Sequence, residues 1–414
     1  MLVEGEVKVE SLWGQRKMTA ENREASPLRV AIIIGDLGFG GAERQVAQIA
    51  NNMDPSKFDV HIICLSDYVP LANSVDRRAR NFHIVKRYFR YDLSTVWRLA
   101  NKLRELDIDL AHAFLFEAEI VLTLASKLYK KSIVVISERN ADYRLRKAAL
   151  FARRWASANA DHVIANSNAG AVFHQNMTSL ANQKYSVVRN GVDTEYFRPG
   201  DKKVSKQNLG ISEGKFVVGM FASFKVQKNH RVMFEAVAAL KKTGSTFEFL
   251  FSGDQLVSGV ESRSKYKVEL MHLVEQLNIG DVCRFLGNRD DLPTVYSACD
   301  VTVLPSIHEG TPNTALESMA CGVPVIVTDV ADNSSIIQDG KSGFLVPVNS
   351  VSHIVNRIQM LRKDPELLMA LGKGAMHTIF ERYSIRAMTI ELADVYTSLC
   401  DRRAGHSPGL DNVQ

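Results

Sequence analysis

The chain has 414 residues, of which 46% are hydrophobic and 23% are charged, and its formal net charge is +5. Because this length exceeds what one hydrophobic core usually fills, we expect two domains. The composition is typical of a globular protein, and so mild a positive charge argues against a nucleic-acid-binding protein. The five cysteines are scattered without metal-ligand spacing, which favours reduced thiols in a cytosolic protein.

The first half of the chain alternates apolar strand patterns with helix patterns. It follows a segment, residues 1–27, that lacks the apolar stretch of a signal peptide and is expected to be a flexible extension. Near-continuous Val and Ile runs between helices are typical of parallel strands covered on both faces. We expect strands within 28–36, 58–66, 107–114, 132–138, 161–167 and 184–193, and helices over 43–53 and over 142–159.

A loop rich in charged residues, FRPGDKKVSKQNLG at 197–210, interrupts this pattern, which then restarts. No stretch reaches the roughly 20 apolar residues that span a bilayer. The sequence therefore predicts two successive doubly wound α/β domains, residues 28–196 and 197–378, then a helix over 379–400 and a flexible tail over 401–414. The second domain and the helical end are expected to contain strands within 215–223, 247–253, 281–287, 300–306, 324–328 and 343–348, and helices throughout 350–400.

The segment EGTPNTALESMACG at 309–322 carries the strongest functional pattern. It begins where a predicted buried strand ends, and ligands of open α/β sheets bind at such strand ends. Its two carboxylates, Glu309 and Glu317, are suited to hold hydroxyl groups. A helix is expected to begin here, and helix N-termini attract phosphate. The polar and backbone N–H groups that suit a diphosphate are those of Gly310, Thr311, Asn313 and Thr314.

Pro312 stands where proline suits the first turn of that helix, so Glu317 is expected about two turns along it. The spacing of the two acids is weak evidence by itself. Glu261 and Glu269 repeat it inside a polar helix pattern, which we interpret as a solvated face. Only the pair that begins at a strand end is therefore a candidate site.

Two further loops follow predicted strands. FASFKVQKNH at 221–230 carries Lys225 and Lys228, which could neutralise a phosphate, although such loops are often merely solvated. GDLGFGGAER at 35–44 has glycines that allow a ligand to approach the backbone closely. The second loop is also an imperfect dinucleotide-binding fingerprint with Asp67 as its ribose-binding acid, but Glu43 stands where the third glycine is needed.

The remaining candidates have simpler alternatives. Asp107 and Asp109 could serve a metal, yet a turn at the start of a strand explains them, and His112 at the end of that strand is a candidate cleft residue. His162, His174 and His272 are interpreted as surface or packing residues. Basic residues recur in the first domain, and those from Arg144 onwards lie on a helix pattern that fits an anionic membrane surface, an anionic acceptor or an ordinary solvated helix. The recurring basic residues are Arg77, Arg78, Arg80, Lys86, Arg87, Arg90, Arg144, Arg146, Lys147, Arg153 and Arg154.

Taken together, these motifs resemble the retaining glycosyltransferases of family four, which have the GT-B fold of two Rossmann-like domains facing a cleft. The resemblance covers residues 28–400. It implies that a nucleotide-sugar donor binds the C-terminal domain, that the acceptor binds the N-terminal domain, and that the last helix returns to the N-terminal domain. The motifs that carry it are GGAER at 40–44, RNGVD at 189–193 with Phe197, QKNH at 227–230 and EGTPNTALESMACGVPVIVTD at 309–329.

The resemblance also implies roles for single residues. Glu309 would contact the hydroxyls of the donor sugar at its reacting face, and Lys228 would bind the diphosphate. Glu317 would bind the ribose, and the segment 284–288 would pack on the nucleobase. No metal or other cofactor is required. Within that segment Gly287 and Asn288 are the implied donor-side residues, and Gly40 and Gly41 are implied to line the cleft.

Two positions depart from the family. Ser223 stands where members usually carry an arginine, and Lys225 is the candidate replacement. Arg139, followed by Asn140, stands where many members have a histidine. An arginine cannot act as a base, since its pKa lies above about 12. We therefore expect Arg139 to bind a phosphate of the donor or of a lipid-diphosphate acceptor.

The predicted activity is that of a hexosyltransferase. It would move a sugar from a UDP- or GDP-type nucleotide sugar to an acceptor hydroxyl with retention, in surface polysaccharide or lipid-linked oligosaccharide biosynthesis. The expected location is the cytoplasm or the inner face of the plasma membrane, without a nucleic-acid partner. The alternatives are a GT-B nucleotide-sugar epimerase, a nicotinamide-dependent oxidoreductase that uses the glycine loop, and a catalytically silent sugar- or lipid-binding protein.

Overall fold

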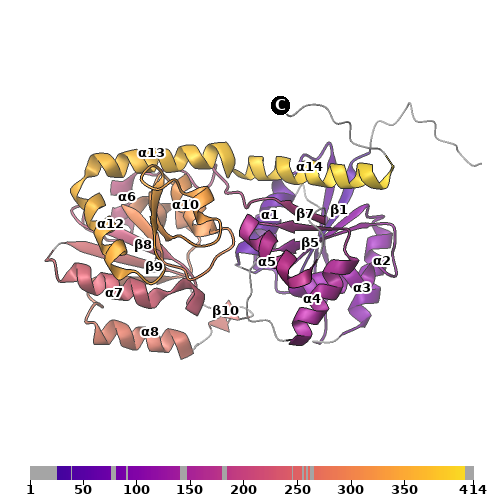
Figure 1. Cartoon of the computed structure of the whole chain (residues 1–414), viewed down its shortest axis with the longest axis horizontal. Coiled ribbons are helices and arrows are strands. Elements are labelled where there is room, and N and C mark those ends of the chain that lie inside the picture. Colours follow the sequence, from indigo (N-terminus) through magenta and orange to yellow (C-terminus); the bar gives the residue numbers. More distant parts are fainter. Residues whose placement is uncertain are drawn as a thin grey trace, which may run out of the picture.

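A computed structural model describes residues 26–38, 40–75, 81–89, 92–139, 147–179, 184–244, 246–253, 256–257, 260–261 and 265–405. The predictions for residues 1–25, for Asn140 and for the tail beyond residue 405 lie outside this part of the chain. The described residues form two α/β domains side by side, and two long helices near the C-terminus run along one edge of both (Figure 1).

The N-terminal domain contains a seven-stranded sheet in the order β3-β2-β1-β4-β5-β6-β7, in which every pairing is parallel. Its strands are β1 (Leu28–Ile34), β2 (Phe58–Cys64), β3 (Phe82–Ile84), β4 (Leu110–Phe114), β5 (Ile133–Glu138), β6 (His162–Ala165) and β7 (Tyr185–Val187). Its helices are α1 (Gly41–Asn52), η1 (Pro70–Ser74), α2 (Ser94–Glu105), α3 (Phe116–Ala125), α4 (Lys147–Asn159) and α5 (Asn168–Thr178).

The side chains of β1 show why its sequence is a continuous apolar run. Successive side chains of a strand point to opposite faces of the sheet. Val30 and Ile32 pack with α1 on one face, whereas Ala31 and Ile33 pack with α2 and α3 on the other. Because helices cover both faces, the five residues from Val30 to Ile34 are all buried, whereas Leu28 and Arg29 at the start of the strand are only partly buried.

The C-terminal domain contains a six-stranded parallel sheet in the order β12-β9-β8-β13-β14-β15, and a short antiparallel hairpin. Its strands are β8 (Phe216–Phe221), β9 (Phe247–Ser252), β10 (Leu256–Val257), β11 (Val260–Glu261), β12 (Cys283–Gly287), β13 (Val301–Leu304), β14 (Val325–Thr328) and β15 (Gly343–Val346). Its helices are α6 (Lys202–Asn208), η3 (Val226–Lys228), α7 (His230–Lys241), α8 (Lys265–Gln276), α9 (Leu292–Ala298), α10 (Asn313–Ala320), α11 (Asn333–Ile336), α12 (Val351–Lys363) and α13 (Pro365–Arg382).

The predicted fold class of two doubly wound parallel α/β domains is confirmed, but details differ. The sequence pattern missed β3, which has only three residues and lies at the sheet edge. The predicted loop at 197–210 contains α6, which Asp201 caps through the backbone N–H groups of Lys203 and Val204. The predicted helix at 379–400 is two helices, because α13 ends at Arg382 and Ser384 caps a new one, α14 (Ile385–Arg403).

The last helix, α14, packs on the N-terminal domain although it follows α13 of the C-terminal domain (Figure 1). Where the chain crosses for the second time, Ser384 forms a parallel bridge with Val192, next to the first crossing. The apolar side of α14 completes the core around α1 and β1 with Ile385, Met388, Leu392, Tyr396 and Leu399. No helix in the described part of the chain is long and apolar enough to cross a membrane.

Candidate functional site

The loop after β8 that carries Lys225 and Lys228 (the lysine loop) and the loop after β13 that carries Glu309 (the acidic loop) are joined by hydrogen bonds. The Gln227 side chain donates to the carbonyl of His308 at 2.9 Å, and the Ile307 N–H donates to the Gln227 carbonyl at 2.8 Å. These bonds bring Lys228 Nζ to 2.5 Å from Glu309 Oε1. The structure therefore unites the lysine and the first acid that the sequence placed in separate loops.

The Lys228–Glu309 ion pair is largely shielded from solvent, and the side chain of Glu309 is only 6% exposed. Ser306 Oγ donates to the same carboxylate oxygen at 2.5 Å. A buried carboxylate is costly unless it is paired and hydrogen-bonded, and both conditions are met here. The pair is thus a preformed charged centre at the carboxyl ends of the strands.

The second acid, Glu317, is the fifth residue of α10 and lies little more than one turn into the helix, closer than predicted. Pro312 is the residue before the helix rather than part of its first turn, and only the four residues from Asn313 to Leu316 precede Glu317 in α10. Tyr296 donates its hydroxyl to Glu317 Oε2 at 2.8 Å, and Arg44 Nη1 lies 3.4 Å from Oε1. Burial raises the pKa of Glu317, while the Arg44 charge opposes that rise.

Arg44 belongs to α1 of the N-terminal domain, so its ion pair with Glu317 crosses between the domains. The candidate residues from the sequence did not include it. Its place in the GGAER motif could have pointed to it, because that motif was already expected to line the cleft.

Three of the residues expected to bind a diphosphate contact the N-terminal domain instead. Thr311 Oγ1 donates to the carbonyl of Asn166 at 2.5 Å, and Asn313 Oδ1 accepts from Asn190 Nδ2 at 2.7 Å. Gly310 approaches so closely that an added Cβ would lie 3.0 Å from the Arg139 carbonyl oxygen. The acidic loop is therefore closed against the other domain, and the Thr311 hydroxyl that was expected to suit a diphosphate is already hydrogen-bonded there.

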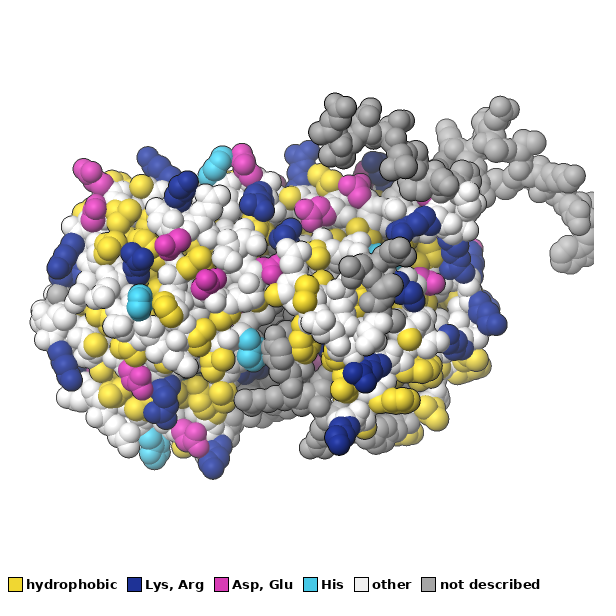
Figure 2. Space-filling view, in the orientation of Figure 1, with side chains coloured by type: hydrophobic (Ala, Val, Ile, Leu, Met, Phe, Trp, Pro, Cys, Tyr) yellow, Lys and Arg dark blue, Asp and Glu magenta, His cyan; other side chains and the backbone are white. Residues whose placement is uncertain are grey.

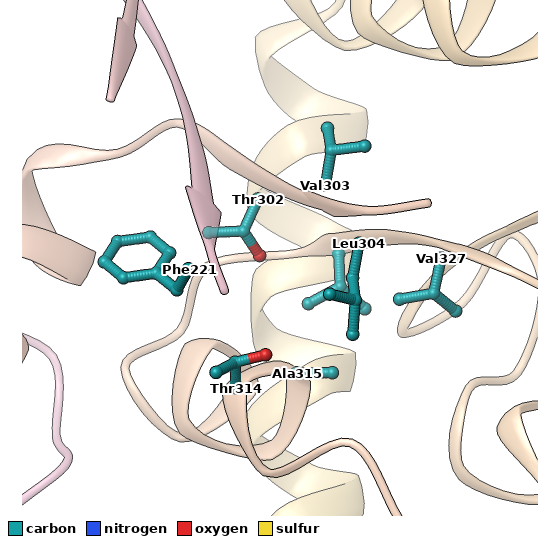
Figure 3. Close-up of a pocket in the computed structure, with 8 residues that line it drawn as sticks. Phe221, Thr302, Val303, Leu304, Thr314, Ala315 and Val327 are labelled. Carbon is teal, nitrogen blue, oxygen red and sulfur yellow. The ribbon is translucent and has the colours of Figure 1, made fainter. Parts of the chain in front are cut away.

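Thr314 lies over a small cavity between α10 and the sheet, where it faces Phe221 and Thr302 (Figure 3). The cavity measures about 10 Å³, which is room for one water molecule. Nucleotide-sized ligands need pockets of roughly 300 Å³ or more. We interpret this cavity as a packing void beneath the helix rather than as a ligand site.

The glycine loop of the N-terminal domain lies directly opposite α10. An added Cβ on Gly41 would lie 2.7 Å from Asn313 Nδ2, so a larger residue there would force the Asn313 side chain to move. The Glu43 carboxylate folds over Gly40, where an added Cβ would lie 2.1 Å from Oε2. A negative charge at this place would repel a pyrophosphate, which counts against the dinucleotide-binding alternative.

The other predicted donor-side residues lie at the same edge of the second sheet. Lys225 is exposed, and its N–H donates to the Ser223 carbonyl at 2.7 Å. The charge of Lys225 acts on Glu43 across the cleft and opposes the rise in the pKa of Glu43 that burial causes. Gly287 has a φ of +64° and accepts from the Gly253 N–H at 2.8 Å, and Asn288 next to it is exposed.

The prediction that His112 faces the cleft is wrong. Its ring is fully buried between Tyr396 of α14 and Ser137 of β5, with 2.7 Å from Nδ1 to the Tyr396 hydroxyl and from Nε2 to Ser137 Oγ. Burial holds its pKa well below the ordinary value. The return of α14 over the sheet encloses this histidine, and sequence periodicity alone did not reveal that cover.

Arg139 was expected to bind a phosphate, but only 7% of the residue is exposed. Its guanidinium lies 4.5 Å from the centre of the Phe114 ring, and Nη1 donates to Asn190 Oδ1 at 2.7 Å. Burial lowers its pKa to about 10, so it remains cationic at neutral pH.

The basic residues of the first domain do not all belong to one surface. Arg153 is buried, and its Nη2 lies 2.8 Å from Glu138 and 3.6 Å from Glu119, so it cannot meet a membrane. Lys147 and Arg154 remain exposed on α4. Lys86 pairs with Asp67 and Arg87 with Glu117. Arg77, Arg78, Arg80, Arg90, Arg144 and Arg146 lie outside the described residues.

The simpler alternatives hold for the remaining candidates. Asp107 and Asp109 form ion pairs with Arg29 and Lys131, as a strand-start turn allows. Among the described residues no group of three or more metal-binding side chains is present. His162 and His174 are buried packing residues, His272 is exposed, and the five cysteines form no disulfide.

The fold defines the class of protein. The structure of Anabaena Alr3699/HepE in complex with UDP and glucose superposes with a TM-score of 0.80, covering 90% of this chain and all of that chain at 21% identity. At this identity the likeness shows the fold, which is the GT-B fold of glycosyltransferases.

The family follows from two models that match consecutive parts of the chain. Residues 39–196 match Glycosyltransferase Family 4, and residues 201–378 match Glycosyl transferases group 1. The chain therefore belongs to the group 1 glycosyl transferases, as its motifs predicted, and it is a transferase.

Two relatives illustrate the range of the family. The D-inositol 3-phosphate glycosyltransferase of Saccharomonospora viridis is 31% identical over 58% of this chain, and the match spans only 56% of that relative. The UDP-Gal:alpha-D-GlcNAc-diphosphoundecaprenol alpha-1,3-galactosyltransferase of Escherichia coli is 25% identical over 87% of this chain and 94% of its own length.

Proposed function

We propose that the protein moves a sugar from a nucleotide-diphosphate sugar to an acceptor hydroxyl with retention of the anomeric configuration. The observation that carries the proposal is the Lys228–Glu309 pair, which lies at the strand ends of the C-terminal domain beside the start of α10. The glycine loop and Arg44 of the N-terminal domain face α10 from the other side. Donor and acceptor would therefore meet between the domains.

The proposed chemistry uses the groups at this junction. As the bond from the anomeric carbon to the diphosphate breaks, negative charge grows on the leaving oxygen. Lys228 and the backbone N–H groups at the start of α10 would stabilise that charge in a preorganised setting. The acceptor oxygen would bond to the anomeric carbon on the same face and pass its proton to the departing phosphate. Glu309 would hold the hydroxyls of the donor sugar.

This step needs neither a dedicated base nor a metal ion, because the phosphate accepts the proton and the chain supplies the positive charge. Lys225 is the proposed replacement for the arginine that position 223 lacks, since it lies in the same loop and its charge acts on Glu43. Glu317 would bind the ribose. Glu317 can bind the ribose only if Arg44, which pairs with the Glu317 carboxylate in this structure, shares or releases that carboxylate.

The names of similar proteins favour particular types of donor and acceptor for this chain. Anabaena HepE was crystallised with UDP and glucose, and the name of the E. coli relative specifies a UDP-sugar and a diphosphoundecaprenol-linked acceptor. We therefore propose a UDP-sugar ahead of a GDP-sugar as the donor. A lipid-linked sugar of surface polysaccharide biosynthesis is the proposed acceptor.

A membrane-bound acceptor fits an exposed apolar segment before and within α2. Tyr88, Phe89, Leu93 and Trp97 are between 62% and 75% exposed. Amphipathic aromatic side chains suit a membrane interface, and nearby basic residues suit anionic lipid. Figure 2 shows hydrophobic side chains bordered by Lys and Arg at the lower right, over the N-terminal domain. The exposed basic residues include Arg104 on α2 and Lys147 and Arg154 on α4.

A thermal-shift screen with UDP, GDP and their sugars tests the donor. We expect stabilisation by UDP and by a UDP-sugar, and the absence of a shift with every nucleotide would contradict the proposal. NMR of the product then tests retention, and an inverted anomer would exclude the proposed step. Conversion of the donor without an acceptor would identify an epimerase, whereas binding without any conversion would identify a silent binding protein.

A further inference from the structure

Three side chains form a continuous line of hydrogen bonds from the N-terminal domain into the acidic loop and back. Arg139 Nη1 donates to Asn190 Oδ1 at 2.7 Å, and Asn190 Nδ2 donates to Asn313 Oδ1 at 2.7 Å. Asn313 Nδ2 lies 3.4 Å from the Gly41 carbonyl oxygen, so the line ends on the glycine loop. We propose that Arg139 is a positioning residue that acts through Asn190 to hold the start of α10 against the N-terminal domain.

The direction of these hydrogen bonds follows from the chemistry of arginine. A guanidinium group only donates, so Asn190 must turn its amide oxygen towards Arg139. Its NH₂ group is then left to donate, and Asn313 must offer its oxygen in return. A neutral histidine can donate or accept at a given nitrogen, depending on its tautomer, and would leave both amides free to flip. The arginine at position 139 therefore fixes the orientation of two amides.

The surroundings of Arg139 hold it in this role. Phe114 stacks on the guanidinium, and the neighbouring Glu138 carboxylate is turned to Arg153 on α4. The Arg139 backbone carbonyl also accepts from Asn166 Nδ2 at 3.3 Å and lies beside Gly310. The main chain of Arg139 is thus linked to the acidic loop through Asn166, and its side chain is linked to the start of α10 through Asn190.

A second contact between the domains is independent of this line. The Asp332 carboxylate, just before α11, accepts the backbone N–H groups of Asn168 at 2.5 Å and of Ala169 at 2.9 Å. These groups open α5 of the N-terminal domain, where a negative charge is favourable. Asp332 therefore provides a matched control, because it joins the same two domains without touching Arg139, Asn190 or Asn313.

The decisive experiment is a double-mutant cycle with R139M and N313A. Small-angle X-ray scattering without ligand measures closure, and donor KM and kcat are measured with the transfer reaction. We expect each variant to increase the radius of gyration and to raise the donor KM by about 10-fold, which is 1.4 kcal/mol and within the range of one intramolecular hydrogen bond. Because Arg139 and Asn313 act through one line of hydrogen bonds that runs through Asn190, breaking it at both ends should be no worse than breaking it at either end.

Two outcomes would overturn the proposal. Additive effects, about 100-fold in KM for the double variant, would mean that Arg139 acts on the substrate directly. An unchanged radius of gyration in R139M and N313A, with the D332N control opening the molecule, would mean that the line of hydrogen bonds does not hold the domains. D332N should add to R139M, since the two contacts are separate.

A variant of the middle residue separates positioning from loss of structure. N190L removes both hydrogen bonds of Asn190 with a side chain of similar size, so it should match N313A in scattering and in KM. Wild-type behaviour of N190L would contradict the proposal. If R139M fails to unfold cooperatively, N190L and N313A still decide, because Asn313 is only half-buried. The kinetic result rests on the proposed function, whereas the scattering result is independent of it.

Discussion

The two faces of the cleft use their charged residues in different ways. On the C-terminal face, Lys228 and Glu309 come from neighbouring loops and meet at strand ends, where a ligand can share them. On the N-terminal face, Arg153 is enclosed with Glu119 and Glu138, and Arg139 is enclosed with Asn190. The first group is arranged for chemistry, and the second is arranged to hold elements in place.

This difference shows how far a local motif can be trusted. The acidic loop and α10 form one continuous segment, so the positions of its residues relative to one another depend mainly on local sequence. The polar residues of the N-terminal face come from β4, β5, α4 and α14, and only tertiary packing decides which of them reach the cleft. Four predictions test the contrast between the two faces, from the largest expected effect to the smallest.

The largest effect is expected from E309Q. The amide keeps the shape of the side chain but removes the charge that pairs with Lys228 and would hold the donor sugar, so kcat should fall by about 10³-fold, or about 4 kcal/mol. A transfer assay at saturating donor measures it. E269Q is the matched control, because Glu269 is exposed on α8 and shares the same spacing motif with Glu261. Equal activity of the two variants would remove Glu309 from the proposed centre.

On the opposite face, R153M should act on stability. It leaves Glu119 and Glu138 buried without their cation, so the free energy of unfolding should fall by about 3–5 kcal/mol. Urea unfolding followed by circular dichroism measures it. R154M on the exposed side of the same helix should change it by less than about 1 kcal/mol. Full stability of R153M would show that the buried charges are not structural.

The two lysines of the loop after β8 should differ. K228M removes the charge beside Glu309 and should lower kcat/KM by about 10²-fold, whereas K225M, which lies in solvent, should lower it by less than about 10-fold. The same transfer assay compares them. Equal losses would mean that Lys225 fully replaces the arginine that position 223 lacks.

A smaller effect is expected from pH. Burial lowers the pKa of His162 to about 4 and of His174 to about 3, below the value of about 6.5 in the unfolded chain. The unfolded state therefore binds more protons below pH 6.5, and stability is lost as the pH falls from there towards the folded values. At pH 5 each histidine should cost about 2 kcal/mol relative to pH 7.

Urea unfolding at pH 7 and pH 5 measures this loss, and H174Q should reduce it by the share of one histidine. The C-terminal domain has a counterpart in His230, whose pKa burial lowers to about 3. Equal stability of the wild type at both pH values would contradict the burial of these rings.

The sequence predicted the two domains and the Glu309–Lys228 centre because strand periodicity and loop position are local properties. It placed Thr311 and Asn313 on the donor side, but their side chains bond to Asn166 and Asn190 across the domain junction. It also left His112 facing the cleft. These placements depend on contacts between residues more than a hundred positions apart, which no local pattern encodes.

The position of α14 has a consequence for biosynthesis. The first domain has its last strand at residues 185–187, yet its core is completed by residues 385–399. At a translation rate of about 5–20 residues per second, roughly 10–40 s pass between the emergence of these segments. During that interval the apolar surface under α14 has no cover from its own chain. The N-terminal domain is therefore the first to be synthesised but cannot be the first to finish folding.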